Sequence, residues 1–325
     1  MPTVDELKAL QDLPWQTKVL KTQTRIYEWY RRFDGQVYLS FSGGKDSTVL
    51  AHIIKGMGLP IEKVFVDTGL EYNEVRAFVK SFGDVTILHP KLRFDEVIRK
   101  YGYPIISKDA AHKIYAARKN TPWALKCFAH DYSYNGKKSR FCLVKYAPLL
   151  NVDFLIGSDC CDVMKKRPFH IYERQSGKKP LVATMTEESY LRKQSWLKNG
   201  CNAFSGKRMR SAPMSFWREQ DVLAYIDAYR LPIAEIYGEV VANGCKLCTT
   251  GAKRTGCVYC AYGAHLRGDE RFLRLKEMHP RQYEYCIEGG GYDTDGLWKP
   301  TKDGLGMRHV FETLNKIYGE QFIKF

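Results

Sequence analysis

The feature that most constrains this chain is the hexapeptide Ser42-Gly-Gly-Lys-Asp-Ser47. It follows a short apolar run, residues 36–41, which is typical of a buried strand. It precedes a second apolar run, residues 48–54, which is typical of a helix that ends at Gly56 and Gly58. A strand that ends in a glycine turn and leads into a helix presents backbone N–H groups and the positive end of the helix dipole. The sequence therefore predicts a phosphate-binding loop, in which Lys45 supplies positive charge to phosphate oxygens.

Strands and helices continue to alternate after the loop. Residues 63–66 and 85–88 are typical of strands, and residues 71–82 between them of a helix. This alternation predicts an α/β fold with a doubly wound parallel sheet. Such sheets bind ligands at the carboxyl ends of their strands, where both the loop and the turn Asp67-Thr68-Gly69 fall. We also expect helices over 15–33, 94–101, 107–119, 187–198 and 216–229, and a strand over 181–184.

Three segments are expected along the 325 residues: an N-terminal helical segment, 1–35, a nucleotide-binding α/β domain, 36–240, and a Cys-rich C-terminal region, 241–325. A shift of composition toward Cys, Gly, Lys and aromatic residues sets the last boundary. No apolar run is long enough to span a bilayer. The first residues also lack the apolar core of a signal peptide. We therefore expect a cytoplasmic protein with no membrane partner.

Charge and cysteine content narrow the function classes. Lysine and arginine outnumber aspartate and glutamate by 51 to 36, a net charge of +15. Such a surplus attracts polyanions, which indicates nucleic acid, although small nucleotides and solubility also account for part of it. Among ten cysteines, two C-x-x-C pairs lie at 245–248 and 257–260, and positions 160–161 are adjacent cysteines. In a reducing cytosol, such groups are more often metal ligands or catalytic thiols than disulfides.

The hexapeptide resembles the PP-loop of the adenine-nucleotide alpha hydrolase superfamily, whose members cleave ATP between the α and β phosphates or bind an adenylyl sulfate there. The turn at Asp67 resembles the superfamily's second motif, which borders the adenosine. Three further stretches are similar to motifs of the phosphoadenosine-phosphosulfate (PAPS) reductase branch. They are Glu188-Ser189-x-x-Arg192, Trp217 with Asp221-Val222, and Cys160-Cys161 followed by Lys165.

This resemblance implies an adenine nucleotide on the loop, either ATP or an adenylyl sulfate, together with Mg²⁺. The residues that it implies for nucleotide binding are Ser42, Gly43, Gly44, Lys45, Asp46, Ser47, Asp67, Thr68, Gly69, Glu188, Ser189 and Lys165. The implied catalytic residues are Lys45, Asp46 and Arg192. Lysine and arginine would stabilise charge on phosphate or sulfate oxygens, and Asp46 would orient its neighbours or help to hold Mg²⁺.

The resemblance also implies a metal centre. In the reductase branch, a Cys-Cys pair and a distant C-x-x-C pair hold a 4Fe-4S cluster beside the nucleotide. The ligands implied here are Cys160, Cys161, Cys257 and Cys260, with Cys245 and Cys248 as alternates, because this chain offers two C-x-x-C pairs. Structural Zn²⁺ is the alternative, and free redox thiols are the third interpretation.

Three function classes follow. The first is cleavage of ATP to AMP and pyrophosphate, which adenylates an acceptor such as tRNA or DNA before sulfur transfer with a sulfur or electron donor protein. The second is reduction of an adenylyl sulfate to sulfite. The ATP-type loop counts against it, as does the lack of a reductase-like C-terminal Cys, since Cys286 has no flanking Gly and His and is expected to be structural. The third is a non-catalytic nucleotide- or nucleic-acid-binding module. We favour the first.

Overall fold

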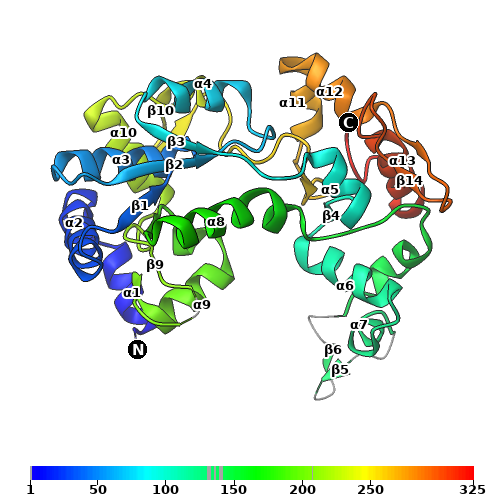
Figure 1. The fold of residues 1–325 in the computed structure, drawn as a ribbon, viewed down its shortest axis with the longest axis horizontal. Coiled ribbons are helices and arrows are strands. Elements are labelled where there is room, and N and C mark those ends of the chain that lie inside the picture. The colour runs from blue at the N-terminus through cyan, green and yellow to red at the C-terminus, as the bar shows by residue number, and fades with distance from the viewer. Residues whose placement is uncertain (1, 130–132, 135–136, 139–141, 207) are drawn as a thin grey trace. The chain divides into compact units, whose positions relative to one another are not determined.

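The computed structural model describes residues 2–129, 133–134, 137–138, 142–206 and 208–325 (Figure 1). The chain divides into two compact units that are interleaved along the sequence. Unit 1 consists of Met1–Asp67, Glu71–His89 and Pro168–Thr255, and unit 2 of Thr68–Leu70, Pro90–Arg167 and Gly256–Phe325. Four of the five junctions between these pieces lie inside the segment 36–240, for which the sequence suggests one domain. The three-segment division stays a prediction about domains.

Unit 1 is built on a six-stranded sheet with the strand order β3-β2-β1-β7-β9-β8. Neighbouring strands are parallel except β8 and β9, which are antiparallel. The strands are β1 (Val37–Ser40), β2 (Glu62–Val66), β3 (Val85–Leu88), β7 (Lys179–Val182), β8 (Asn202–Ala203) and β9 (Arg210–Ser211). The chain order reverses at β1, which has β2 on one side and β7 on the other. This arrangement confirms the predicted α/β fold.

Helices and a hairpin complete unit 1. They are α1 (Val4–Gln11), α2 (Trp15–Arg32), α3 (Lys45–Gly56), α4 (Asn73–Ser81), α8 (Arg167–Ser176), η3 (Thr186–Glu188), α9 (Tyr190–Asn199), α10 (Glu219–Tyr229), η4 (Glu235–Tyr237) and the strands β10 (Val240–Asn243) and β11 (Lys246–Thr249). Helices α2, α3 and α10 contact one another. Their apolar faces join Leu39 and Phe41 of the central strand segment in one core, where Trp29 and Trp217 are fully buried. The helix expected from 216 begins three residues later, because Arg218 has extended backbone and its amide donates to the Asp221 carboxylate, which caps the helix there (2.7 Å).

Unit 2 contains short strand pairs and helices. Its elements are α5 (Phe94–Tyr101), β4 (Ile105–Ile106), α6 (Lys108–Arg118), α7 (Pro122–Lys126), β5 (Ser133–Tyr134), β6 (Lys137–Lys138), η1 (Val144–Asn151), η2 (Asp162–Lys166), β12 (Ala261–Tyr262), α11 (Arg271–Met278), α12 (Pro280–Ile287), β13 (Gly291–Tyr292), β14 (Trp298–Lys299) and α13 (Met307–Tyr318). The helices predicted over 94–101 and 107–119 are confirmed as α5 and α6. In the part of the chain that the structure describes, no helix has both the length and the apolar character needed to cross a membrane.

Candidate functional site

The predicted phosphate loop lies between β1 and α3 in unit 1. Gly43 has a φ of +70°, and a Cβ added there would lie 2.6 Å from Cγ2 of Val79 and 2.9 Å from Cγ1 of Val75. Both the backbone conformation and the close packing on α4 therefore require glycine. Gly44 has extended backbone and is the residue from which α3 begins. Its position at the carboxyl end of β1 is the switch point of the sheet, where ligands of this architecture bind.

The two serines of the loop close it with their own hydrogen bonds. The Ser42 amide donates to Oγ of Ser47 (3.2 Å), and that hydroxyl contacts Oγ of Ser42 at 3.0 Å. Ser47 Oγ and Thr48 Oγ1 both donate to the carbonyl oxygen of Gly44 (2.9 and 3.0 Å). The turn is thus built before any ligand arrives, and the first N–H groups of α3 have no partner within the helix. A preorganised helix N-terminus of this kind suits an anion.

Lys45 is buried, and its ammonium group already has contacts. Nζ donates to the carbonyl oxygen of Lys253 (3.0 Å) and lies 3.4 Å from Oε1 of Glu219. It also lies 5.3 Å from the centre of the Tyr237 ring. The charge is therefore held at the loop by a carbonyl, a carboxylate and an aromatic face. A phosphate would have to take over part of this coordination.

Asp46 lies at the centre of a charged group. Burial raises the pKa of its carboxyl to about 6, although Lys45 and Arg254 favour the ionised form. Arg192 also acts on this carboxyl, and burial lowers the pKa of the Arg192 guanidinium. The structure therefore brings the three predicted catalytic residues together within unit 1. It adds Arg254 to them.

The Glu-Ser-x-x-Arg stretch forms the turn that positions Arg192. Ser189 caps α9, because its Oγ accepts a hydrogen bond from the Arg192 amide (3.2 Å). The Glu188 carboxylate accepts from the Met185 amide (2.9 Å) and pairs with the Arg192 guanidinium. Both predicted nucleotide-binding residues thus have local contacts that hold the arginine in place.

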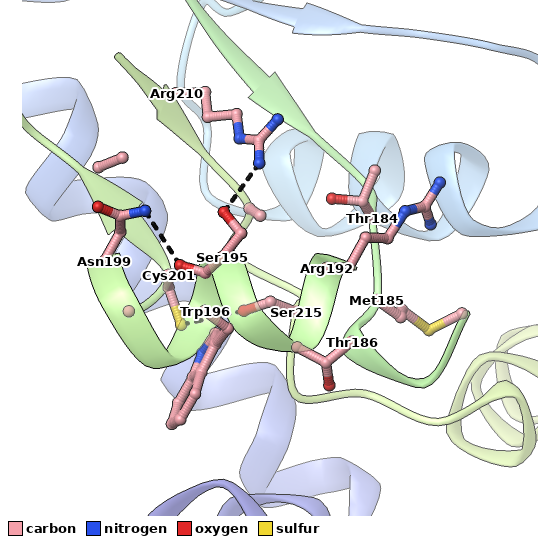
Figure 2. A pocket seen from close by; sticks show the side chains of 13 residues that line it. Thr184, Met185, Thr186, Arg192, Ser195, Trp196, Asn199, Cys201, Arg210 and Ser215 are labelled. Atoms are coloured by element: carbon pink, nitrogen blue, oxygen red, sulfur yellow. Dashed lines mark hydrogen bonds between the residues drawn. The ribbon is translucent and has the colours of Figure 1, made fainter. Parts of the chain in front are cut away.

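A small pocket lies beside α9 (Figure 2). Its volume is about 30 Å³, room for a water molecule. Arg192 and Arg210 both line it, and Nη2 of Arg210 donates to Oγ of Ser195 (3.0 Å). Arg210 thus contacts the middle of α9, and its charge further lowers the pKa of the Arg192 guanidinium.

The turn Asp67-Thr68-Gly69 after β2 lies at a boundary between the two units, whereas the phosphate loop lies entirely in unit 1. The buried Asp67 carboxylate accepts hydrogen bonds from Arg76 Nη2 (2.8 Å) and Nε (3.2 Å). Thr68 and Gly69 belong to unit 2, where Oγ1 of Thr68 accepts from the Leu70 amide (3.1 Å). Their role in nucleotide binding stays a prediction.

The four cysteines implied as metal ligands all belong to unit 2, although about a hundred residues separate the two pairs. They are Cys160, Cys161, Cys257 and Cys260. Strand β4 pairs in parallel with β12, which directly follows Cys260. The same region binds the segment before Cys160, since the Tyr103 amide donates to the Leu155 carbonyl (2.8 Å) and the Gly157 amide to the Tyr103 carbonyl (3.2 Å). Residues 102–106 therefore hold both cysteine segments.

Two further contacts fix these segments. A Cβ at Gly157 would lie 1.6 Å from the Tyr101 carbonyl oxygen, so only glycine permits this approach. Arg271 Nη1 donates to the carbonyl oxygens of Cys260 (2.9 Å) and Tyr262 (3.0 Å), while Asp269 pairs with the same guanidinium. Arg271 thus anchors the turn that carries the C-x-x-C pair.

The four thiols influence one another's ionisation. The interaction with the Cys161 thiol, together with burial, raises the pKa of Cys160, and the thiols of Cys257 and Cys260 raise it further. The hydrogen bond from Cys160 lowers the pKa of Cys161, against the effect of burial. Three lysines lower it further, at positions 108, 165 and 166. Burial raises the pKa of Cys260 to about 11. Lys165, predicted at the nucleotide, therefore lies beside Cys161 in unit 2.

The four cysteines have the chemistry of metal ligands. Within the described ranges, no three His, Cys, Asp or Glu side chains are arranged so that they would hold a metal ion. The donor set is nevertheless suitable, because thiolates are the ligands of Fe–S clusters and of structural zinc, and nearby lysines offset their negative charge. Cys245 and Cys248 belong to unit 1, where Cys245 is exposed in the turn between β10 and β11. The ligand choice stays a prediction.

Sequence reasoning missed several residues of the charged group: Arg254, Glu219, Tyr237 and Arg210. Arg254 lies in this group because hydrogen bonds bring its segment close to Lys45. The Gly251 and Ala252 amides donate to the carbonyls of Tyr237 and Ile236 (both 2.9 Å), which brings residues 250–255 back to Lys45. The only sequence signal was the basic pair at 253–254 between the two C-x-x-C pairs.

A strand–loop–helix unit at the switch point of a mostly parallel sheet defines this chain as an α/β protein. The chain belongs to the phosphoadenosine phosphosulfate reductase domain family, whose model matches residues 36–261. This membership confirms the family that the motifs indicated.

Two curated relatives are uncharacterized proteins of Methanocaldococcus jannaschii. One is 25% identical over 296 residues, which cover 87% of this chain and 56% of the relative. The other is 38% identical over 285 residues, which cover 84% of this chain and 48% of the relative. The chain thus spans about half the length of the curated relatives that it matches.

Two solved structures show a weaker likeness. The PAPS reductase from Candida auris, in a phosphate complex, has a TM-score of 0.38 at 14% identity and covers 74% of this chain and 95% of its own. The U34-tRNA thiolase NcsA from Methanococcus maripaludis, with its [4Fe-4S] cluster, has a TM-score of 0.35 at 13% identity and covers 96% and 92%. Likeness at this level says nothing about the ligands of this chain.

Proposed function

We propose that this protein cleaves ATP to AMP and pyrophosphate and couples the resulting adenylation of a nucleic-acid acceptor to sulfur transfer. The observation that carries the proposal is the loop at the N-terminus of α3, where the buried Lys45 ammonium donates to the carbonyl of Lys253, the residue before Arg254. The charges of Lys45, Arg254 and Arg192 all favour the ionised form of Asp46 beside it and so lower the pKa of this carboxyl. Three cations and a helix N-terminus complement the charge of a triphosphate. The cations come from three separate parts of the chain, and only Lys45 and Arg192 belong to motifs.

The proposed reaction is a displacement at the α-phosphorus. An oxygen of the acceptor attacks, the bond from the α-phosphorus to the bridging oxygen breaks, and pyrophosphate leaves with the bonding electrons. Negative charge grows on the leaving phosphates, where Lys45 and the first amides of α3 stabilise it. Asp46 in its ionised form orients Lys45, or it accepts a hydrogen bond from a water molecule bound to the Mg²⁺ that accompanies ATP.

Unit 2 would serve the sulfur-transfer half of the reaction. Cys160, Cys161, Cys257 and Cys260 would hold the proposed 4Fe-4S cluster, with zinc as the alternative. Such a cluster supplies an iron atom that can bind sulfur. The chain's own contribution is the pair of anchored turns and the lysines beside Cys161.

Family membership favours a second candidate, sulfonucleotide reduction. That reaction needs a thiol nucleophile, and Cys286 does not suit this role. Its side chain is fully buried, Sγ lies 3.4 Å from Sδ of Met307, and burial raises the pKa of its thiol. A buried neutral thiol is a poor nucleophile. Of the two candidates, ATP cleavage therefore agrees better with the described residues.

The test is pyrophosphate release from ATP by anaerobically purified protein, with and without total tRNA or duplex DNA. We expect release that nucleic acid stimulates. A parallel reaction contains an adenylyl sulfate, with or without the 3′-phosphate, plus thioredoxin. Sulfite formation there, without pyrophosphate release from ATP, would replace the proposal with the reductase activity. Nucleotide binding with neither product would support a binding module.

A further inference from the structure

Helices α6 and α7 in unit 2 present an aromatic surface to solvent. Trp123 is 48% exposed, and its ring stacks on His112 with ring centres 5.9 Å apart and an angle of 28° between planes. Nearby, Nζ of Lys119 lies 4.3 Å from the centre of the Tyr115 ring. Lys126 at the end of α7 is also exposed. We call these five residues the α6–α7 platform.

The platform is an exposed feature of a well-anchored part of the unit. Ala111, Ile114 and Ala124 are fully buried on the other sides of the two helices. The Arg118 guanidinium ties the end of α6 to the chain, since it donates to the carbonyls of Phe154 and Val152. A large aromatic side chain that stays exposed on such a fixed scaffold is available for a partner.

Charge identifies the kind of partner. Residues 90–167, which carry the platform, contain 16 lysines and arginines against 7 aspartates and glutamates. Residues 256–325, the other large segment of unit 2, contain 10 of each kind. The positive charge of the unit therefore lies in the platform's own segment. Basic residues interleaved with exposed aromatic rings bind single-stranded nucleic acid, because bases stack on the rings while phosphates contact the cations.

We propose that the α6–α7 platform binds unpaired nucleotides of an RNA acceptor. RNA is the class that fits, because its loops expose unstacked bases, whereas a duplex hides the base faces that Trp123 and His112 would contact. The inference rests on the proposed function only for the statement that the bound RNA is an acceptor. Binding itself needs neither ATP nor a cluster.

The test is fluorescence anisotropy of the full chain with a labelled 12-nucleotide oligouridylate, the corresponding oligodeoxyuridylate and a 12-base-pair DNA duplex, without ATP. We expect the RNA strand to bind tightest. Trp123→Ala should weaken its binding about tenfold or more, and Trp123→Phe, which keeps a ring, should retain most of it. Lys126→Ala should lower the slope of log K against log salt by about 0.7, as for one lost phosphate contact.

Tyr27→Ala is the matched control. Tyr27 is 50% exposed on α2 in unit 1, and the Arg31 guanidinium lies 5.9 Å from its ring centre, so it too pairs a ring with a cation. This variant should bind RNA like the wild type. Equal weakening by Tyr27→Ala, wild-type binding by a folded Trp123→Ala variant, or preference for the duplex would each overturn the proposal. Failed pyrophosphate release with intact RNA binding would instead contradict the proposed function.

Discussion

The phosphate loop in unit 1 and the cysteine group in unit 2 are built in opposite ways. The loop is one run of six residues, fixed by its own hydrogen bonds and by the fit of Gly43 against α4. The cysteine group joins two distant segments through a two-residue strand pair and the contacts of Arg271. The loop thus has its geometry before a ligand arrives. The thiols instead depend on contacts that join residues about a hundred positions apart in the sequence, and the Cys161, Cys257 and Cys260 thiols all raise the pKa of Cys160.

This difference suggests a division of roles. A site that binds and releases a nucleotide in every cycle benefits from preorganised donors. Metal ligands commonly close around the metal, because binding and local folding are coupled. The two regions should therefore respond differently to substitution, and the following predictions test this contrast.

The largest effect is expected for Lys45→Ala. Loss of its ammonium removes a preorganised charge from the leaving phosphates, so pyrophosphate release should fall by about 10²–10³-fold. Lys55→Ala, at the exposed end of the same helix, is the control and should release pyrophosphate at the wild-type rate. Iron content should be unchanged in both variants. A Lys45→Ala variant that loses its iron would show that the two regions are not independent.

Cys257→Ser should show which of the two C-x-x-C pairs binds the metal. We expect anaerobically purified Cys257→Ser to lose most of its iron and its visible absorbance, whereas Cys245→Ser retains both, because Cys245 lies in the other unit. Metal analysis and an absorption spectrum measure this. A colourless wild type with one tightly bound zinc would contradict the cluster, and iron loss in Cys245→Ser alone would reverse the ligand choice.

Gly43→Ala tests how rigid the loop is. Gly58→Ala is its control, since Gly58 has a φ of +66° but nothing within 4 Å of an added Cβ. Both substitutions impose the strain of positive φ, roughly 1 kcal/mol. Only Gly43→Ala also forces Val79 and Val75 apart, which should cost about 1–3 kcal/mol more and weaken ATP binding. Urea unfolding and calorimetric titration measure both. Equal losses in the two variants would mean that the loop adapts easily.

The smallest effect concerns pH. If ionised Asp46 is needed, kcat/KM for pyrophosphate release should fall as the pH decreases below about 6, the pKa to which burial raises this carboxyl. Asp46→Asn should be slower and lack this acid limb. An identical acid limb in Asp46→Asn would assign the limb to another group.

The same shift predicts a stability effect. The folded state holds the Asp46 proton more tightly than the unfolded chain does, so ionisation disfavours folding. The penalty is absent below about pH 4 and complete above about pH 6. Asp46→Asn should therefore gain stability relative to the wild type as the pH rises through this window. Unfolding curves at pH 4 and pH 7 measure the difference, and a constant difference would contradict the shift.

The sequence was sufficient for the loop because every residue that forms it is contiguous, and β3 was predicted with its bounds at 85 and 88. It could not reveal Arg254 or Glu219, because tertiary packing brings them to Lys45 from about 170 to 210 positions away. The two C-x-x-C pairs have equal spacing, so spacing alone could not show that one lies on a hairpin of unit 1 and the other in unit 2. Local sequence patterns predict helices and strands. The unit in which a helix or strand packs depends on contacts with residues far away in the sequence.

The interleaving of the two units has a consequence for biosynthesis. Unit 1 needs strand β7 beside β1, and the segment that contains β7 is translated only after residues 90–167 of unit 2 have been synthesised. Unit 2 in turn needs β12 beside β4, which arrives after unit 1 is complete. Each nascent half therefore exposes unpaired strand edges while it awaits its later segment. During that interval, chaperones have more to protect than in a protein whose domains emerge one after the other.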